Sequence, residues 1–257
     1  SAYATIISTI TSVVTKDTVV ISDELNHNCI INGTRMSSAC GKVIYPHLDM
    51  DVLSSSLKEW AGKAKRALII TDGIFSMRGD HAPLDQIMEI AQEHDYMYEE
   101  NAVVLVDDSH GVGAMGKTGR GVEEFTKSTP VDILVGTLGK AFGVNGGYVT
   151  SSNAVIDFLR EKSPMYIYSN PITTGEASAA RKAVQVVNSH DGRSLLKNLR
   201  DLTKHFEDGV TAIGMETIPG NHPVVPLMIR DTEQTRSLTD YLYQHGVLVT
   251  GLTYPVV

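Results

Sequence analysis

One lysine stands out as a residue that could do covalent chemistry. Lys140 lies in the segment Gly136–Gly147, GTLGKAFGVNGG, where small and apolar residues surround it. Partial desolvation lowers the pKa of such an amine and makes it a nucleophile toward an aldehyde. The alternative is a surface lysine on a glycine-rich turn, and the lysine alone would favour that alternative. It therefore needs partners before it indicates a reaction.

A second cluster of reactive side chains follows the apolar run Val103–Val106. Asp107, Asp108, Ser109 and His110 come directly after it, and a glycine-rich loop comes next. Ligands of open α/β sheets bind beyond the carboxyl ends of the strands, where these side chains would lie. Asp and Ser also commonly cap turns, and the cluster alone does not separate the two interpretations.

The lysine and the acid together match the needs of one cofactor. Pyridoxal 5'-phosphate (PLP) requires an acid against its pyridine nitrogen, a lysine for its aldehyde and donors for its phosphate. Asp107 and Lys140, which follow two different predicted strands, could supply the first two groups. The pair therefore predicts a PLP site.

The elements that must position these residues alternate between strands and helices. Apolar β-branched runs predict strands at 18–22, 67–71, 103–107, 132–137, 146–150, 224–229 and 247–250. Helical patterns are found at 3–14, 30–38, 83–94, 154–161, 175–190, 194–213 and 234–244. Runs buried on both faces are typical of a parallel sheet. We expect an α/β fold with a mostly parallel sheet flanked by helices, comprising a large domain over 1–190 and part of a smaller α/β domain over 191–257.

Composition limits the classes of function. The chain has 257 residues, of which 42% are hydrophobic and 20% charged, and its net charge of −8 comes with scattered Lys and Arg. We therefore expect no nucleic-acid partner, because the electrostatic attraction that drives such binding is missing. The apolar runs are far shorter than the roughly 20 residues that cross a bilayer, so we expect no membrane partner. Two closely spaced cysteines, Cys29 and Cys40, indicate reduced thiols and a cytoplasmic protein. We assign no residue to a metal.

Four ordered segments resemble the α-oxoamine synthase family of fold-type I PLP-dependent transferases. They are Ser22–His27, Thr71–Met77, Val106–Gly111 and Gly136–Lys140, with the sequences SDELNH, TDGIFSM, VDDSHG and GTLGK. The resemblance runs from Tyr3 to the end of the chain. It implies an acyltransferase that condenses an amino acid with an acyl-coenzyme A, and a homodimer whose active sites use residues of both subunits.

The resemblance also implies a role for each matching residue. Lys140 would form the Schiff base with PLP, Asp107 would keep the pyridine nitrogen protonated, and His110 would donate to the phenolic oxygen. His27 would stack on the ring, and these four residues would be catalytic. The remaining cofactor contacts would be Ala2 and Tyr3 at the first helix N-terminus, Ser76 near the phenolic oxygen, Thr137 at the phosphate, and Ser169 with Asn170 at the partner subunit's phosphate.

The sequence departs from the family pattern in two ways. Asn28 and Cys29 follow the histidine where the family often has Ala-Ser, which predicts different packing under the cofactor. The family's carboxylate-binding arginine and its N-terminal helical segment have no counterpart between Ser1 and Val257. We therefore expect a chain that is cut at both ends.

Three functions fit these observations. The glycine C-acetyltransferase branch, which joins glycine to acetyl-coenzyme A and keeps the carboxylate, is favoured by the segments at 23–27, 137–141, 146–148 and 169–170. The first alternative is the 8-amino-7-oxononanoate synthase branch, which joins alanine to a longer acyl thioester and releases carbon dioxide. The second is a binding module that keeps the fold without the chemistry, and the presence of the lysine, the acid and both histidines argues against it.

Overall fold

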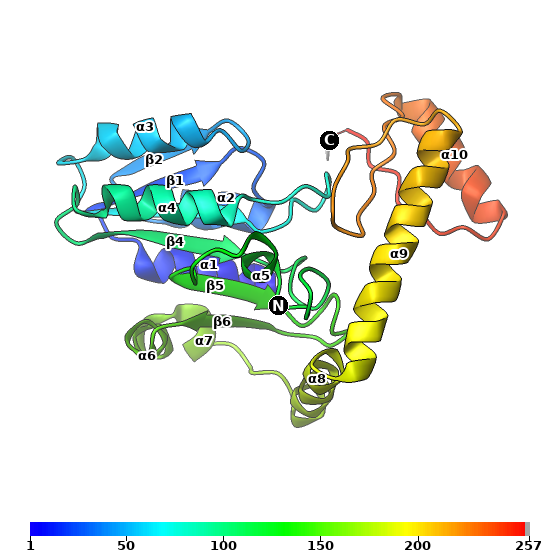
Figure 1. Cartoon of the computed structure of the whole chain (residues 1–257). Helices are drawn as coiled ribbons and strands as arrows, with labels where there is room; N and C mark the ends of the chain where they lie inside the picture. Colours follow the sequence, from blue (N-terminus) through cyan, green and yellow to red (C-terminus); the bar gives the residue numbers. More distant parts are fainter. Residues whose placement is uncertain (255–257) are drawn as a thin grey trace.

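A six-stranded sheet lies at the centre of the computed structural model, which describes residues 1–254 (Figure 1). Its order is β2-β1-β3-β4-β5-β6, and all neighbours are parallel except β5 and β6. The strands are β1 (Thr18–Asp23), β2 (Gly41–Tyr45), β3 (Arg66–Asp72), β4 (Asn101–Asp107), β5 (Ile133–Thr137) and β6 (Gly147–Ser151). The predicted mostly parallel sheet is confirmed.

Helices cover both faces of this sheet, which is why β1, β3 and β5 are buried along nearly their whole length. On one face lie α1 (Ala2–Val13) and α2 (Asn28–Met36), with α6 (Asn153–Lys162) and α7 (Pro164–Ile167) against α1. On the other face lie α3 (Met50–Trp60), α4 (Leu84–Asp95) and α5 (Val122–Thr126).

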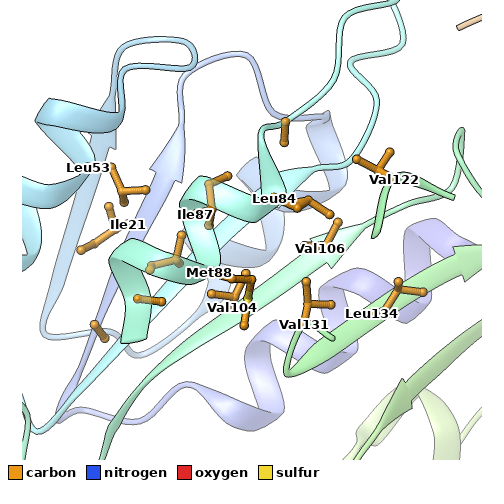
Figure 2. Packing of buried hydrophobic residues seen from close by; sticks show 14 of the residues in the cluster. Ile21, Leu53, Leu84, Ile87, Met88, Val104, Val106, Val122, Val131 and Leu134 are labelled. Carbon is orange, nitrogen blue, oxygen red and sulfur yellow. The ribbon is translucent and has the colours of Figure 1, made fainter. Parts of the chain in front are cut away.

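Each face has its own apolar core. Ile6 and Ile10 of α1 and Ile30 of α2 pack on residues of β1, β3, β4 and β5. On the opposite face, Leu53 of α3 and Ile87 of α4 pack on alternate residues of the same strands, as Figure 2 shows. Because side chains on a strand alternate between faces, neighbouring residues serve different cores. Helices α1 and α2 thereby hold their N-termini at the sheet edge where β1, β3, β4 and β5 end.

The C-terminal part consists of α8 (Thr174–Val187), α9 (His190–Ala212) and α10 (Thr232–Gln244). Figure 1 shows these helices on the side toward which the arrows of β4 and β5 point. The break between α8 and α9 falls at Asn188–Ser189, and the Ser189 hydroxyl caps α9 by accepting from the Gly192 N–H.

The two strands predicted near the C-terminus are wrong. Residues 224–229 make a single isolated bridge, between Leu227 and Thr217, and 247–250 make no β-pairing with any described residue. A strand requires a partner for its backbone N–H and C=O groups. Leu248 is 86% exposed, so this apolar run has neither a partner strand nor a covering layer within residues 1–254. Residues 255–257, the end of the expected small domain, lie outside the described part.

Candidate active site

A pocket of about 260 Å³ opens beyond the carboxyl ends of β1, β3, β4 and β5. Its lining includes most of the residues selected from the sequence, namely Ala2, Tyr3, His27, Ser76, Asp107, His110, Thr137 and Lys140. Five further residues complete the lining: Ser1, Cys29, Asp72, Ile74 and Ser109. A larger, more open recess of about 570 Å³ beside α5 contains none of them, so the chemistry is concentrated in the smaller pocket.

Lys140 lies three residues beyond β5, in a turn that Thr137 stabilises. The Thr137 hydroxyl accepts from the Gly139 N–H at 3.1 Å and donates to the Gly146 carbonyl at 3.2 Å. Burial lowers the pKa of the Lys140 amine, and the opposing charges of Asp107 and Asp72 offset part of that shift. A larger fraction of the amine is therefore in the neutral, nucleophilic form.

Two buried carboxylates lie side by side at the strand ends. Asp107 of β4 pairs in register with Asp72 of β3, and both side chains are at most 5% exposed. Asp107 Oδ1 accepts from the Ser109 N–H at 3.0 Å, and Asp72 Oδ2 accepts from the His27 N–H at 2.8 Å. Burial and the neighbouring Asp107 raise the pKa of Asp72 well above its usual range. Asp72 is a pocket residue that the sequence analysis did not predict, although it directly follows the predicted strand at 67–71.

Both histidines of the pocket are held neutral near pH 7. Burial lowers the pKa of His110 to about 3, with further contributions from Lys140, His222 and His27. Burial also lowers the pKa of His27, against the attraction of Asp107. A neutral imidazole has one N–H donor and one acceptor nitrogen, so each ring can donate a single hydrogen bond to a ligand.

One contact to the pocket comes from the C-terminal part and could not be seen in the sequence. His222 is 4% exposed, and its Nε2 lies 2.9 Å from the His110 carbonyl oxygen, to which it donates. Its Nδ1 accepts from the Val224 N–H at 3.2 Å. The two bonds are compatible with one tautomer and attach the segment before Val224 to the pocket wall.

Asn28, which stands where the family often has alanine, forms a hydrogen bond with Tyr3. The Tyr3 hydroxyl donates to Asn28 Oδ1 at 2.8 Å, and Asn32 Nδ2 donates to the Tyr3 hydroxyl at 2.8 Å. The Tyr3 and His27 rings meet edge to face with centroids 6.3 Å apart. Gly147 of β6 allows this end of α1 to approach, because a Cβ there would lie 2.7 Å from the Ala2 nitrogen.

A family model described as "Aminotransferase class I and II" matches residues 1–257. The chain belongs to this family. The family's cofactor is PLP, and the relatives described next support the resemblance to its α-oxoamine synthases.

Two curated relatives are named 8-amino-7-oxononanoate synthase. The protein from Thermosipho melanesiensis is 38% identical over 249 residues, which are 96% of this chain and 61% of that protein. The protein from Symbiobacterium thermophilum is 41% identical over 240 residues, which are 93% and 59% of the two proteins. The chain thus spans about three fifths of the length of these relatives.

Solved structures share the fold. The serine palmitoyltransferase of Sphingomonas wittichii matches 100% of this chain and 62% of its own, with a TM-score of 0.91 at 24% identity. The serine palmitoyltransferase of S. paucimobilis, solved with a bound PLP–myriocin adduct, matches 97% of this chain and 63% of its own, with a TM-score of 0.88 at 25% identity. Among residues 1–254, no helix has both the length and the apolar character of a membrane span.

The residues of the pocket fit the cofactor of the family. An amine, an acid and two neutral imidazoles converge there, and the N-terminus of α1 provides N–H donors suited to a phosphate. The Thr137 hydroxyl lines the pocket but donates to the Gly146 carbonyl, so its expected contact with the phosphate stays a prediction. The hydroxyl of Ser109, which also lines the pocket, is buried without a hydrogen-bond partner in the described part of the chain. Such a hydroxyl is available to a ligand.

Two of the expected cofactor contacts lie elsewhere. Ser169 and Asn170 are exposed residues between α7 and α8 and do not line the pocket, and the Ser169 hydroxyl donates to the Met165 carbonyl. Within one subunit the structure therefore does not bring this pair together with Lys140. Their assignment to a partner subunit's phosphate stays a prediction.

Proposed function

We propose that the intact protein is a PLP-dependent acyltransferase that condenses an amino acid with an acyl thioester and releases carbon dioxide, in the manner of 8-amino-7-oxononanoate synthase. The observation that carries the proposal is the convergence of Lys140, Asp107, His110 and His27 in one pocket at the carboxyl edge of the sheet. Curated relatives that are 35–41% identical bear that name, which supports alanine and a longer acyl thioester as substrates.

PLP, when bound, supplies an electron sink that stabilises negative charge at the substrate's α-carbon. In our proposal the Lys140 amine moves the proton at that carbon, since burial lowers its pKa toward the range of a general base. The Asp107 carboxylate would accept a hydrogen bond from the protonated pyridine nitrogen of the cofactor, and the Ser109 N–H keeps that carboxylate oriented. His110, neutral near pH 7, would donate its single N–H to the phenolic oxygen of the cofactor.

The second candidate is the condensation of glycine with acetyl-coenzyme A, without loss of carbon dioxide. It is favoured by the segments at 23–27, 137–141 and 146–148 and by Ser169–Asn170. The curated relatives carry the other name, so this candidate takes second place.

We further propose a homodimer in which Ser169 and Asn170 reach the neighbouring subunit's phosphate. We also propose that the chain divides into a domain over 1–190 and part of a second one over 191–257.

Cofactor attachment is tested by the absorbance spectrum of the purified full-length protein with PLP. The visible band of a lysine-bound cofactor should be present in the wild type and in a Lys16→Ala control, where an exposed lysine is removed, and absent in Lys140→Ala. A band that survives in Lys140→Ala would refute the assignment. No band in any form would leave the binding-module alternative.

The substrate class is tested by the release of free coenzyme A. We expect kcat/KM for alanine with a long-chain dicarboxylic acyl thioester to exceed that for glycine with acetyl-coenzyme A by at least about 100-fold, a margin expected when a pocket is built for the larger acyl group. The reverse order would establish the second candidate, and no release with either pair would contradict the acyltransferase proposal.

A further inference from the structure

We propose that Cys29 is a positioning residue for the active site: its thiol donates a hydrogen bond to Asp107 and holds that carboxylate in the orientation that faces the pocket. The inference deepens the proposed function and rests on it, because it concerns the acid assigned to the pyridine nitrogen. The family often has a serine at this position, so the departure at Cys29 would preserve a donor rather than lose one.

The geometry places the thiol beside the acid. Cys29 lies in the first turn of α2, is 1% exposed, and belongs both to the pocket lining and to the apolar cluster under α1 and α2. Its Sγ is 3.6 Å from Asp107 Oδ2, a donor–acceptor distance compatible with the larger radius of sulfur. The contact joins α2 to the end of β4, two elements 78 residues apart.

A second acceptor competes for the same thiol proton. The Cys29 Sγ is also 2.8 Å from Nδ1 of His27. That nitrogen, however, already accepts from the Cys29 backbone N–H at 3.2 Å, which is the bond that caps α2. A neutral imidazole has one acceptor nitrogen with one lone pair, so the cap occupies it. With that nitrogen engaged in the cap, we assign the thiol proton to Asp107, and the infrared test below distinguishes the two acceptors.

The thiol remains a donor across the working pH range. Burial and the nearby carboxylates of Asp107 and Asp72 raise the pKa of Cys29 well above its usual value. With Ser109 N–H on Oδ1 and the thiol on Oδ2, each oxygen of Asp107 has one fixed donor. Rotation of the carboxylate would break both bonds, so its remaining lone pairs stay directed to the pocket.

The hydrogen bond itself can be tested in the cofactor-free protein by the infrared band of the S–H stretch. The chain has two cysteines, and Cys40 is exposed, so a Cys40→Ser background leaves Cys29 as the one thiol observed. We expect a band displaced from that of a free thiol, which Asp107→Ala returns to the free position and His27→Ala leaves displaced. Asp107→Asn provides the same test, with a smaller shift, if Asp107→Ala does not fold. A band that responds to His27→Ala and not to Asp107 variants would overturn the proposal.

The consequence for the site is tested by PLP affinity, measured by equilibrium dialysis of the full-length protein. Cys29→Ala should weaken binding about three- to tenfold, since a donor to a charged group is lost and the S–H donor is weak. Cys29→Ser should stay within about twofold of the wild type, because its hydroxyl can donate to the same oxygen. Equal losses in both variants would indicate packing alone and would overturn the positioning role. If Lys140→Ala retained its absorbance band, the proposed function would fail while the infrared result would still decide whether the thiol bonds to Asp107.

Discussion

His47, in the loop after β2, links the end of β1 to the loop after β3 and should make stability depend on pH. Its Nδ1 is 3.0 Å from Asp23 Oδ1 at the end of β1, and its Nε2 is 3.2 Å from Asp80 Oδ2 in the loop after β3. Arg78 donates to the same Asp80 oxygen at 2.7 Å. Burial alone would lower the pKa of His47, but its hydrogen bonds to Asp23 and Asp80 and their charges outweigh burial and raise it to about 9.

The sign and size of the effect follow from this shift. A histidine whose pKa is about 6.5 in the unfolded chain and about 9 in the folded one stabilises the fold fully below pH 6.5, and the contribution disappears as the pH rises through 9. A shift of that size corresponds to an upper limit of about 3.4 kcal/mol at 1.36 kcal/mol for each pKa unit. Because solvent partly screens the cluster, we expect about 1.5–2 kcal/mol.

The assay is urea unfolding of the wild type and His47→Gln at pH 6, 7.5 and 9.5, followed by the fluorescence of Trp60, the single tryptophan. The difference in unfolding free energy should be largest at pH 6 and should fall by about 1.5 kcal/mol by pH 9.5. His205→Gln, an exposed histidine on α9, is the matched control and should show no such trend. A His47→Gln difference that is the same at all three pH values would refute the reasoning.

Two further predictions concern the glycine-rich loop and the second acid after β4. Gly121→Ala should destabilise the fold by at least about 3 kcal/mol in chemical denaturation, because φ is +89° and the new Cβ would lie 1.8 Å from Asp108 Oδ2. Gly62→Ala is the control: its φ is +75°, but the new Cβ would meet open space, so the cost should be only about 1–2 kcal/mol. Similar costs would contradict the steric argument. Burial raises the pKa of Asp108 to about 8 despite its bond from the Val122 N–H, so wild-type stability should fall relative to Asp108→Asn as the pH rises from about 4 to 8 in unfolding titrations. A relative stability that does not change with pH would show that Asp108 is not protonated in the fold.

Several elements could be predicted because their pattern was local. The apolar runs that became β1, β3, β4 and β5 are continuous, since both faces of these strands are covered. The edge strand β2 was missed: burial alternates along it, and only five residues carry the pattern. Helix α3 was missed as well, because three consecutive serines, 54–56, interrupt its apolar stripe. The two C-terminal strands were overpredicted because an apolar run shows strand propensity without showing whether a partner strand exists.

The sequence by itself determined that Lys140, Asp107 and His110 would lie at one edge of a parallel sheet. That conclusion needs only strand ends and the rule that ligands bind beyond them. Tertiary structure alone decided which side chains touch. It brought the Cys29 thiol to Asp107, the Tyr3 hydroxyl to Asn28, and His222 to the His110 carbonyl, and it left Ser169 outside the pocket. These contacts depend on how α1, α2 and the C-terminal segment pack on the sheet, and periodicity in a single chain shows which face is buried but not what it is buried against.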